Sequence, residues 1–75
     1  MSLSDLDAAL LAAHSVNDKP RLARLYWTAG DTMLAKGDID AGCFYLTHAY
    51  IFALDCGAPE ARDIHKILVA HGREK

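Results

Sequence analysis

Residues 37–57 read GDIDAGCFYLTHAYIFALDCG, and this segment carries the strongest structural signal in the chain. A glycine stands at each end, Asp38 is a typical N-cap residue, and the apolar residues between them recur at helical spacing. The segment therefore predicts a helix over about 39–56. Apolar side chains occupy nearly all of its faces, so we expect neighbours to cover it on several sides or one face to meet another protein.

One face of this helix is predicted to point into the core. Its residues follow the i, i+3, i+4 spacing of a buried helical stripe: Ile39, Gly42, Cys43, Leu46, Ala49, Tyr50, Ala53 and Leu54. A second apolar face carries Phe44, Tyr45, Ile51 and Phe52. We expect Cys43 to act as a small core residue.

The segments on either side of residues 37–57 predict three further helices, over about 3–16, 19–36 and 59–71. Ser2 and Ser4 each precede an aspartate by three residues, which is typical of a capping box. The turn residues 17–20 end the first helix, and the second helix follows at once. Pro59 is predicted at the first position of the last helix, and Gly72 at its end. No segment alternates with the period of a strand.

These elements predict an all-α fold with one domain over residues 1–75. Loops of a few residues make consecutive helices antiparallel neighbours, and glycines at 30 and 42 let helix axes approach closely. We expect a stack of helical hairpins. An up-and-down four-helix bundle is the alternative packing.

Composition restricts the function. The chain has 75 residues, eight Lys and Arg against ten Asp and Glu, and a formal net charge of −2, which argues against nucleic acid as a partner. The longest apolar tract, residues 49–54, is too short to span a membrane.

Cys43 and Cys56 lie on one predicted helix about 20 Å apart, too far for a disulfide. With no secretory signal at the start of the sequence, we expect a cytoplasmic protein.

Residues 26–49 place small and large side chains at fixed offsets around Gly37: Tyr26, Gly30, Met33, Gly42, Leu46 and Ala49. This pattern resembles a tetratricopeptide repeat, whose two helices cross closely where the small residues lie. It departs from the family pattern at Ala29, Met33, Gly42 and Leu54, and Pro59 comes five residues after the usual position. The resemblance implies a protein-interaction scaffold in which the first and last helices cap one hairpin.

Two groups of residues are candidates for partner binding. The first is aromatic and surrounds a histidine: Trp27, Phe44, Tyr45, His48 and Phe52. The second is the basic cluster Lys19, Arg21 and Arg24 at the start of the second helix, which helix-dipole complementation does not explain and which suits an acidic peptide or a carboxylate. A core role for the first group and a solvated face for the second are the alternatives.

No catalytic motif, phosphate-binding loop or histidine pair with metal-ligand spacing occurs. We therefore expect no enzyme activity, no cofactor and no metal. The predicted function is a non-enzymatic interaction module or adaptor that binds a protein partner or itself. A structural homodimer or small subunit is one alternative, and a metal- or ligand-binding bundle using His48 with Tyr45 and Asp55 is another.

Overall fold

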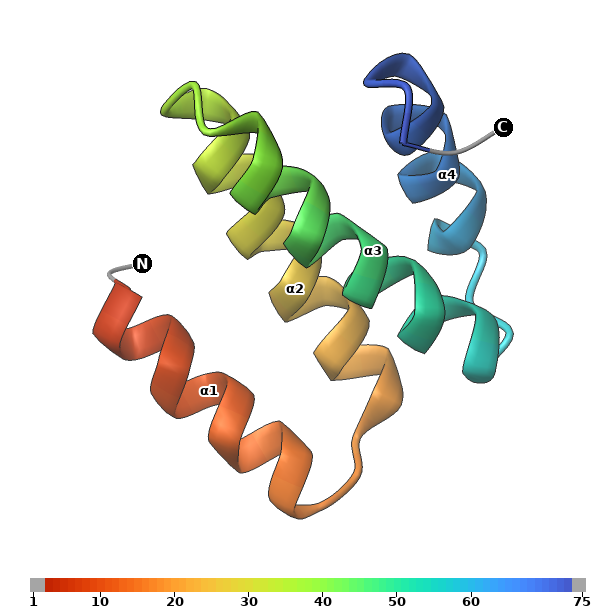
Figure 1. Ribbon diagram of the computed structural model, residues 1–75. Coiled ribbons are helices and arrows are strands. Elements are labelled where there is room, and N and C mark those ends of the chain that lie inside the picture. Colours follow the sequence, from red (N-terminus) through yellow and green to blue (C-terminus); the bar gives the residue numbers. More distant parts are fainter. Residues whose placement is uncertain (1–2, 74–75) are drawn as a thin grey trace.

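The computed structural model describes residues 3–73 and contains four helices (Figure 1). They are α1 (Leu3–Ser15), α2 (Lys19–Ala35), α3 (Ile39–Asp55) and α4 (Glu60–Ala70), and no described residue lies in a strand. The predicted all-α class is confirmed, and every predicted helix end lies within one residue of the observed one. Ser2 and its predicted capping role lie outside the described residues.

Each described helix ends in the same kind of turn. The second residue after the helix takes a positive φ angle, and these residues are Asn17, Gly37, Gly57 and Gly72. The next N–H group then bonds back to the last turn, as Asp38 N–H does to the Met33 carbonyl at 2.9 Å. This Schellman motif satisfies carbonyls that the helix end leaves unpaired, and it sharply reverses the chain.

Side chains of the turns start the next helices. Asp38 caps α3 by accepting a hydrogen bond from the Ala41 N–H at 3.1 Å, as predicted, and Asp18 caps α2 through the Arg21 N–H at 3.3 Å. Pro59 precedes α4 instead of occupying its first position. The difference is one residue, and Pro59 already has helical backbone angles.

The α2–α3 hairpin is the most closely packed part of the molecule. A Cβ atom built on Gly30 would lie 2.6 Å from Leu46 Cγ, and one built on Gly42 would lie 2.6 Å from Leu34 Cδ2. These distances are too short for real atoms, so the two backbones approach in a way that only glycine permits. The predicted close approach at residues 30 and 42 is confirmed.

The helices pack in chain order, with α1 against α2, α2 against α3 and α3 against α4. In Figure 1, α1 and α4 form opposite edges of the array, and the Cα atoms span 32 × 28 × 13 Å. Within the described residues α1 and α4 share no extensive contact of the kind that closes an up-and-down bundle. The packing order is that of a hairpin stack.

The core has two parts. The larger joins α2, α3 and α4 around Leu46, Ile64 and Leu68, and the smaller joins α1 to α2 around Leu6, Ala13 and Leu22. Most residues predicted to point inward on α3 are buried, Cys43 included.

Two residues of the predicted inward face are exposed instead. Ile39 is 38% exposed and Leu54 is 55% exposed. The prediction for them was wrong because they lie in the first and last turns of α3, where helical spacing persists but the neighbouring helices do not cover the end.

Candidate interaction surface

Five aromatic and histidine side chains from three helices meet on one face of the molecule. We call this group the ring cluster: His14, Tyr26, Tyr45, His48 and Phe52. The three α3 members follow one another at spacings of three and four residues, so they share a helix face. The turn after α1 and the α2–α3 hairpin bring the other two members beside them.

Tyr26 of α2 is the centre of the ring cluster. Its ring centroid lies 5.6 Å from that of Phe52 and 5.3 Å from that of His48, in stacked arrangements. His14 of α1 meets Phe52 edge-on at 5.9 Å. The cluster therefore links α1 to α3 across α2, with Tyr26 half-buried and His14 exposed.

Two hydrogen bonds orient the histidines. His14 Nε2 and the Tyr26 hydroxyl lie 3.0 Å apart, and His48 Nδ1 lies 2.9 Å from the Phe44 carbonyl oxygen. A carbonyl oxygen only accepts, so His48 Nδ1 must carry the proton. In the neutral ring, Nε2 of His48 then keeps its lone pair free to accept a hydrogen bond from a partner.

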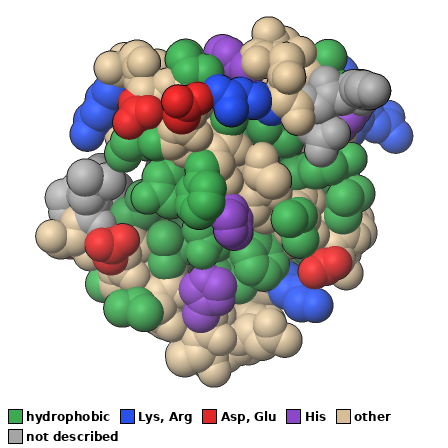
Figure 2. Space-filling view, viewed as in Figure 1, with side chains coloured by type: hydrophobic (Ala, Val, Ile, Leu, Met, Phe, Trp, Pro, Cys, Tyr) green, Lys and Arg blue, Asp and Glu red, His purple; other side chains and the backbone are tan. Residues whose placement is uncertain are grey.

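A row of side chains runs along the outer side of α3, beside the ring cluster. We call it the outer stripe: Phe44, Thr47, Ile51 and Leu54. The Phe44 side chain is 60% exposed and the Ile51 side chain is 50% exposed. Figure 2 shows hydrophobic side chains over the centre of this face, histidines among them and charged side chains toward the rim. Exposed large apolar residues that lie in a continuous group are typical of interaction sites.

Trp27 does not join the other predicted aromatic residues. It packs against the larger core cluster, and its Nε1 atom is buried without a hydrogen-bond partner among the described residues. Burial raises the pKa of the Asp31 carboxyl one helical turn further on, and the Trp27 indole partly offsets this rise. Trp27 Nε1 and the Asp31 carboxyl group are therefore neighbours, but they do not form a hydrogen bond.

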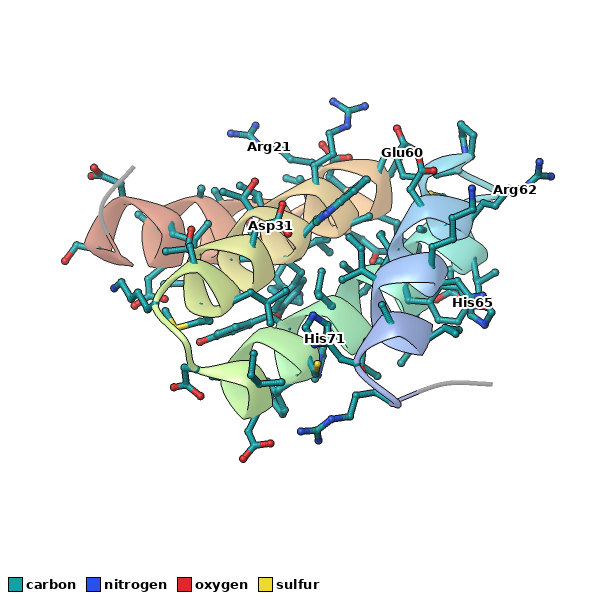
Figure 3. All side chains as sticks on the ribbon, turned by 90° about the horizontal axis from the view of Figure 1, so that it is seen from above. Arg21, Asp31, Glu60, Arg62, His65 and His71 are labelled. Atoms are coloured by element: carbon teal, nitrogen blue, oxygen red, sulfur yellow. The ribbon has the colours of Figure 1, made fainter. Side chains whose placement is uncertain are left out.

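The three residues of the basic cluster also differ in their surroundings. Lys19 Nζ lies 3.9 Å from an Asp55 carboxylate oxygen, while Arg21 and Arg24 are exposed and form no ion pair with another described residue. Arg21 and Asp31 project from the side of α2 opposite α3 (Figure 3). The structure therefore places Phe44, with the Tyr45–His48–Phe52 face, on one side of α2, and Arg21 on the other.

Two shallow depressions lie along α3. One, of about 490 Å³, opens between the end of α3 and the start of α4 and is lined by Tyr50, Leu54, Pro59, Arg62, His65 and neighbouring small residues. The other, of about 480 Å³, lies near the start of α3 beside Phe44 and Thr47. Arg73 closes its edge through a hydrogen bond to Asp40, and this bond together with the carboxylate charge raises the pKa of Arg73.

The alternative metal site finds no set of ligands in residues 3–73. No three His, Cys, Asp or Glu side chains in that range gather closely enough to hold an ion. Asp55 lies beside Lys19 at one end of α3, and His48 donates to the helix backbone.

His14 and Tyr26 are members of the ring cluster that the sequence did not assign to the site. They are separated by 12 positions and come from different helices, so no local spacing connects them. Their contact follows from the sharp turn at Asn17, which has a positive φ angle. Asparagine adopts such an angle less often than glycine does, so the residue type alone indicates the turn only weakly.

Comparison with protein-family models, curated proteins and solved structures finds no match to this chain. No helix in the described part of the chain is long and apolar enough to cross a membrane.

Proposed function

We propose that this protein is a non-enzymatic, cytoplasmic interaction module that binds a protein partner through the ring cluster and the adjoining outer stripe. The observation that carries this proposal is the continuity of the two groups over α1, α2 and α3, with Phe44 60% exposed beside the half-buried rings. The resemblance of residues 26–49 to a tetratricopeptide repeat supports the same function. The two free thiols support a reducing compartment.

The chemistry of the surface favours an uncharged partner segment. Aromatic rings supply large contact areas at low conformational entropy cost, and the hydroxyl of Tyr26 and Nε2 of His48 supply hydrogen bonds that fix its orientation. The exposed Arg21 lies on the opposite side of α2. We therefore assign partner binding to the ring cluster instead of the basic cluster, and we expect no nucleic-acid binding.

Affinity capture from the source cells tests this function, with the protein as bait and two baits altered in the ring cluster. His14→Ala with His48→Ala removes both histidine rings without cutting into the core, because neither side chain is buried. Tyr45→Ser removes a ring that stacks on Tyr26 at 6.3 Å. We expect a stoichiometric partner on the unaltered bait and a loss of at least tenfold on both altered baits.

Leu11→Ser is the matched control, since Leu11 is 72% exposed on α1 and is not part of the ring cluster. It should retain the partner, and circular dichroism should show the same helical signal for all four baits. Equal retention by the unaltered and altered baits would contradict the assignment.

The outer stripe favours a second candidate function, a structural homodimer or small subunit. A helix that is apolar on nearly all faces leaves part of its surface uncovered in the single chain, and a second chain would cover it.

A further inference from the structure

We propose that the depression between the end of α3 and the start of α4 binds a small organic acid whose carboxylate contacts Arg62 and whose apolar body covers Leu54. We call this depression the α3–α4 pocket; Tyr50, Leu54, Arg62 and His65 are among the residues that line it. Arg62 and His65 belong neither to the ring cluster nor to the outer stripe. The pocket therefore adds a ligand site beyond the proposed protein-binding surface.

The pocket is bounded at both ends, which favours a compact ligand. Tyr50 and His65 meet across one end, with ring centroids 5.4 Å apart, and the turn at Gly57 joins the two helices at the other end. Positions 50 and 57 are about 10 Å apart along α3 at 1.5 Å per residue. An extended peptide would leave the pocket after about three residues. A molecule of roughly ten heavy atoms fits between the ends and within the volume of about 490 Å³.

Three polar side chains of the pocket can hold a carboxylate. Arg62 and His65 are three residues apart and project from the same side of α4 (Figure 3). The contact with His65 brings the Tyr50 ring beside them. Within residues 3–73, neither the Arg62 guanidinium nor the Tyr50 hydroxyl has a hydrogen-bond or ion-pair partner. A guanidinium donates two parallel hydrogen bonds to a carboxylate, and the hydroxyl and the imidazole N–H supply further donors.

The charges at the pocket favour an anion. No Asp or Glu lines it, and Arg62 contributes a formal positive charge. Lys66, one turn further along α4, is exposed and forms no ion pair with another described residue. Arg73 is bonded to Asp40 at the other end of α3, so its charge is balanced there.

The acids of the neighbouring turns lie outside the pocket. Asp55 has Lys19 Nζ at 3.9 Å. Glu60 and Asp63 lie about 140–160° around α4 from His65, because each residue turns the helix by about 100°. A carboxylate bound at His65 and its neighbours thus meets the side of α4 from which the native carboxylates are directed away.

Apolar side chains make the rest of the wall. Leu54, Ala58 and Pro59 contribute to it, and Leu54 is 55% exposed in the free chain. An ion pair in water contributes little by itself, so covering this wall must supply much of the affinity. The pocket therefore suits an acid with an apolar body about as long as the pocket, such as 3-phenylpropanoate, and not a bare anion such as acetate.

Titration of the isotope-labelled protein with 3-phenylpropanoate at pH 7, followed by NMR, tests the pocket. We expect saturable shift changes confined to residues 50–66, with a dissociation constant of about 1 mM or lower. Two matched compounds each lack one part of the ligand: 3-phenylpropanamide has no charge, and acetate has no apolar body. Each should bind at least tenfold more weakly than 3-phenylpropanoate.

Arg62→Gln tests the carboxylate contact, because it removes the charge and the paired donors at an exposed position. It should weaken binding at least tenfold. Lys66→Gln is the matched control, since it removes one positive charge from an exposed position on the same helix outside the pocket. It should change the affinity less than twofold, and circular dichroism should show the same helical signal for both variants.

An acetylated tripeptide that ends in phenylalanine distinguishes a free acid from the end of a protein chain. Tighter binding of this peptide than of 3-phenylpropanoate would overturn the assignment to a free acid. The site would also be overturned by the absence of saturable shifts up to about 20 mM acid, by equal binding of the amide, or by equal losses in Arg62→Gln and Lys66→Gln.

Capture of a protein partner is a separate readout. Arg62→Gln leaves the ring cluster unaltered, so a bait that keeps its partner but loses the acid supports both proposals. Partner capture without acid binding would remove only the ligand site. Acid binding without a captured partner would remove only the proposed function.

Discussion

At the scale of single residues, Gly30 and Gly42 set the distance between the two central helices. The carbonyl oxygen of each glycine lies 3.0–3.1 Å from the position that a Cβ atom on the other glycine would take, and leucine side chains fill the remaining space. A backbone oxygen cannot move away by changing rotamer, as a side chain can. The α2–α3 contact therefore tolerates no added methyl group without a shift of a whole helix.

We predict that Gly30→Ala destabilises the protein by about 1 kcal/mol or more, because overpacking costs about 1–3 kcal/mol and helix propensity returns at most about 1. Urea unfolding followed by circular dichroism measures this loss. Gly37→Asn is the control, since Gly37 has a φ angle of 83° in open space and Asn17 already takes a φ of 54° in the preceding turn. It should change stability by less than about 0.5 kcal/mol, and a Gly30→Ala protein as stable as this control would refute the close contact.

Asp31 supplies a second prediction at this scale. Its pKa is raised in the folded protein, mainly because the carboxyl group is partly buried although the residue lies at the surface. A carboxyl group with a raised folded-state pKa favours folding below its unfolded pKa and loses that contribution as the pH rises through the folded value. We therefore expect Asp31→Asn to raise the melting temperature at pH 7 and to make no difference near pH 3.

Thermal melts of both proteins between pH 3 and pH 7 measure this difference. Asp7→Asn, at an exposed position on α1, reports the general effect of removing one negative charge. An Asp31→Asn protein less stable than the wild type at pH 7 would show that the carboxylate has a favourable partner there.

At the scale of elements, the sequence predicts most of the fold because each helix end carries its own local signal. Asp38 marks the start of α3 and Gly37 the end of α2, and both signals depend only on hydrogen bonds within a few residues. The exposure of Leu54 could not be predicted in this way. It depends on where α4 leaves the end of α3, which is a property of the tertiary packing.

The candidate site shows the same limit. Tyr45, His48 and Phe52 share a helix face, so sequence spacing alone groups them. Trp27 was grouped with them by residue type, but its position on α2 directs it to the core shared with α4. His14 was missed because only the fold brings it to Tyr26.

The outer helices should open before the central hairpin. α1 contacts only α2 extensively, through the smaller core cluster, whereas α3 is packed between α2 and α4. We predict that native-state hydrogen exchange gives a lower opening free energy for α1 amides than for α3 amides. Leu6→Ala, which removes a side chain that is 6% exposed, should speed exchange in α1 and leave α3 nearly unchanged.

Leu11→Ala is the matched change for this measurement, because that side chain is 72% exposed and contributes little to packing. Equal opening free energies for α1 and α3 would mean that the two core clusters unfold as one unit.

At the scale of the whole molecule, the two broad faces differ in chemistry. One carries the ring cluster and the outer stripe, and the opposite side of α2 carries the exposed Arg21 and Asp31. A 75-residue chain buries a limited fraction of its surface, so the apolar side chains that remain outside bear directly on its behaviour in solution. Three of the seven exposed large apolar residues in the described part of the chain, Phe44, Ile51 and Leu54, lie together in the outer stripe. A continuous group of this kind is typical of an interaction site.

Hydrogen exchange of the protein bound to its captured partner, compared with the free protein, tests the location of the binding surface most directly. The account predicts slower exchange in residues 43–54 and around His14, with no change in α4. Slower exchange confined to residues 19–31 or to α4, with α3 unaffected, would contradict it.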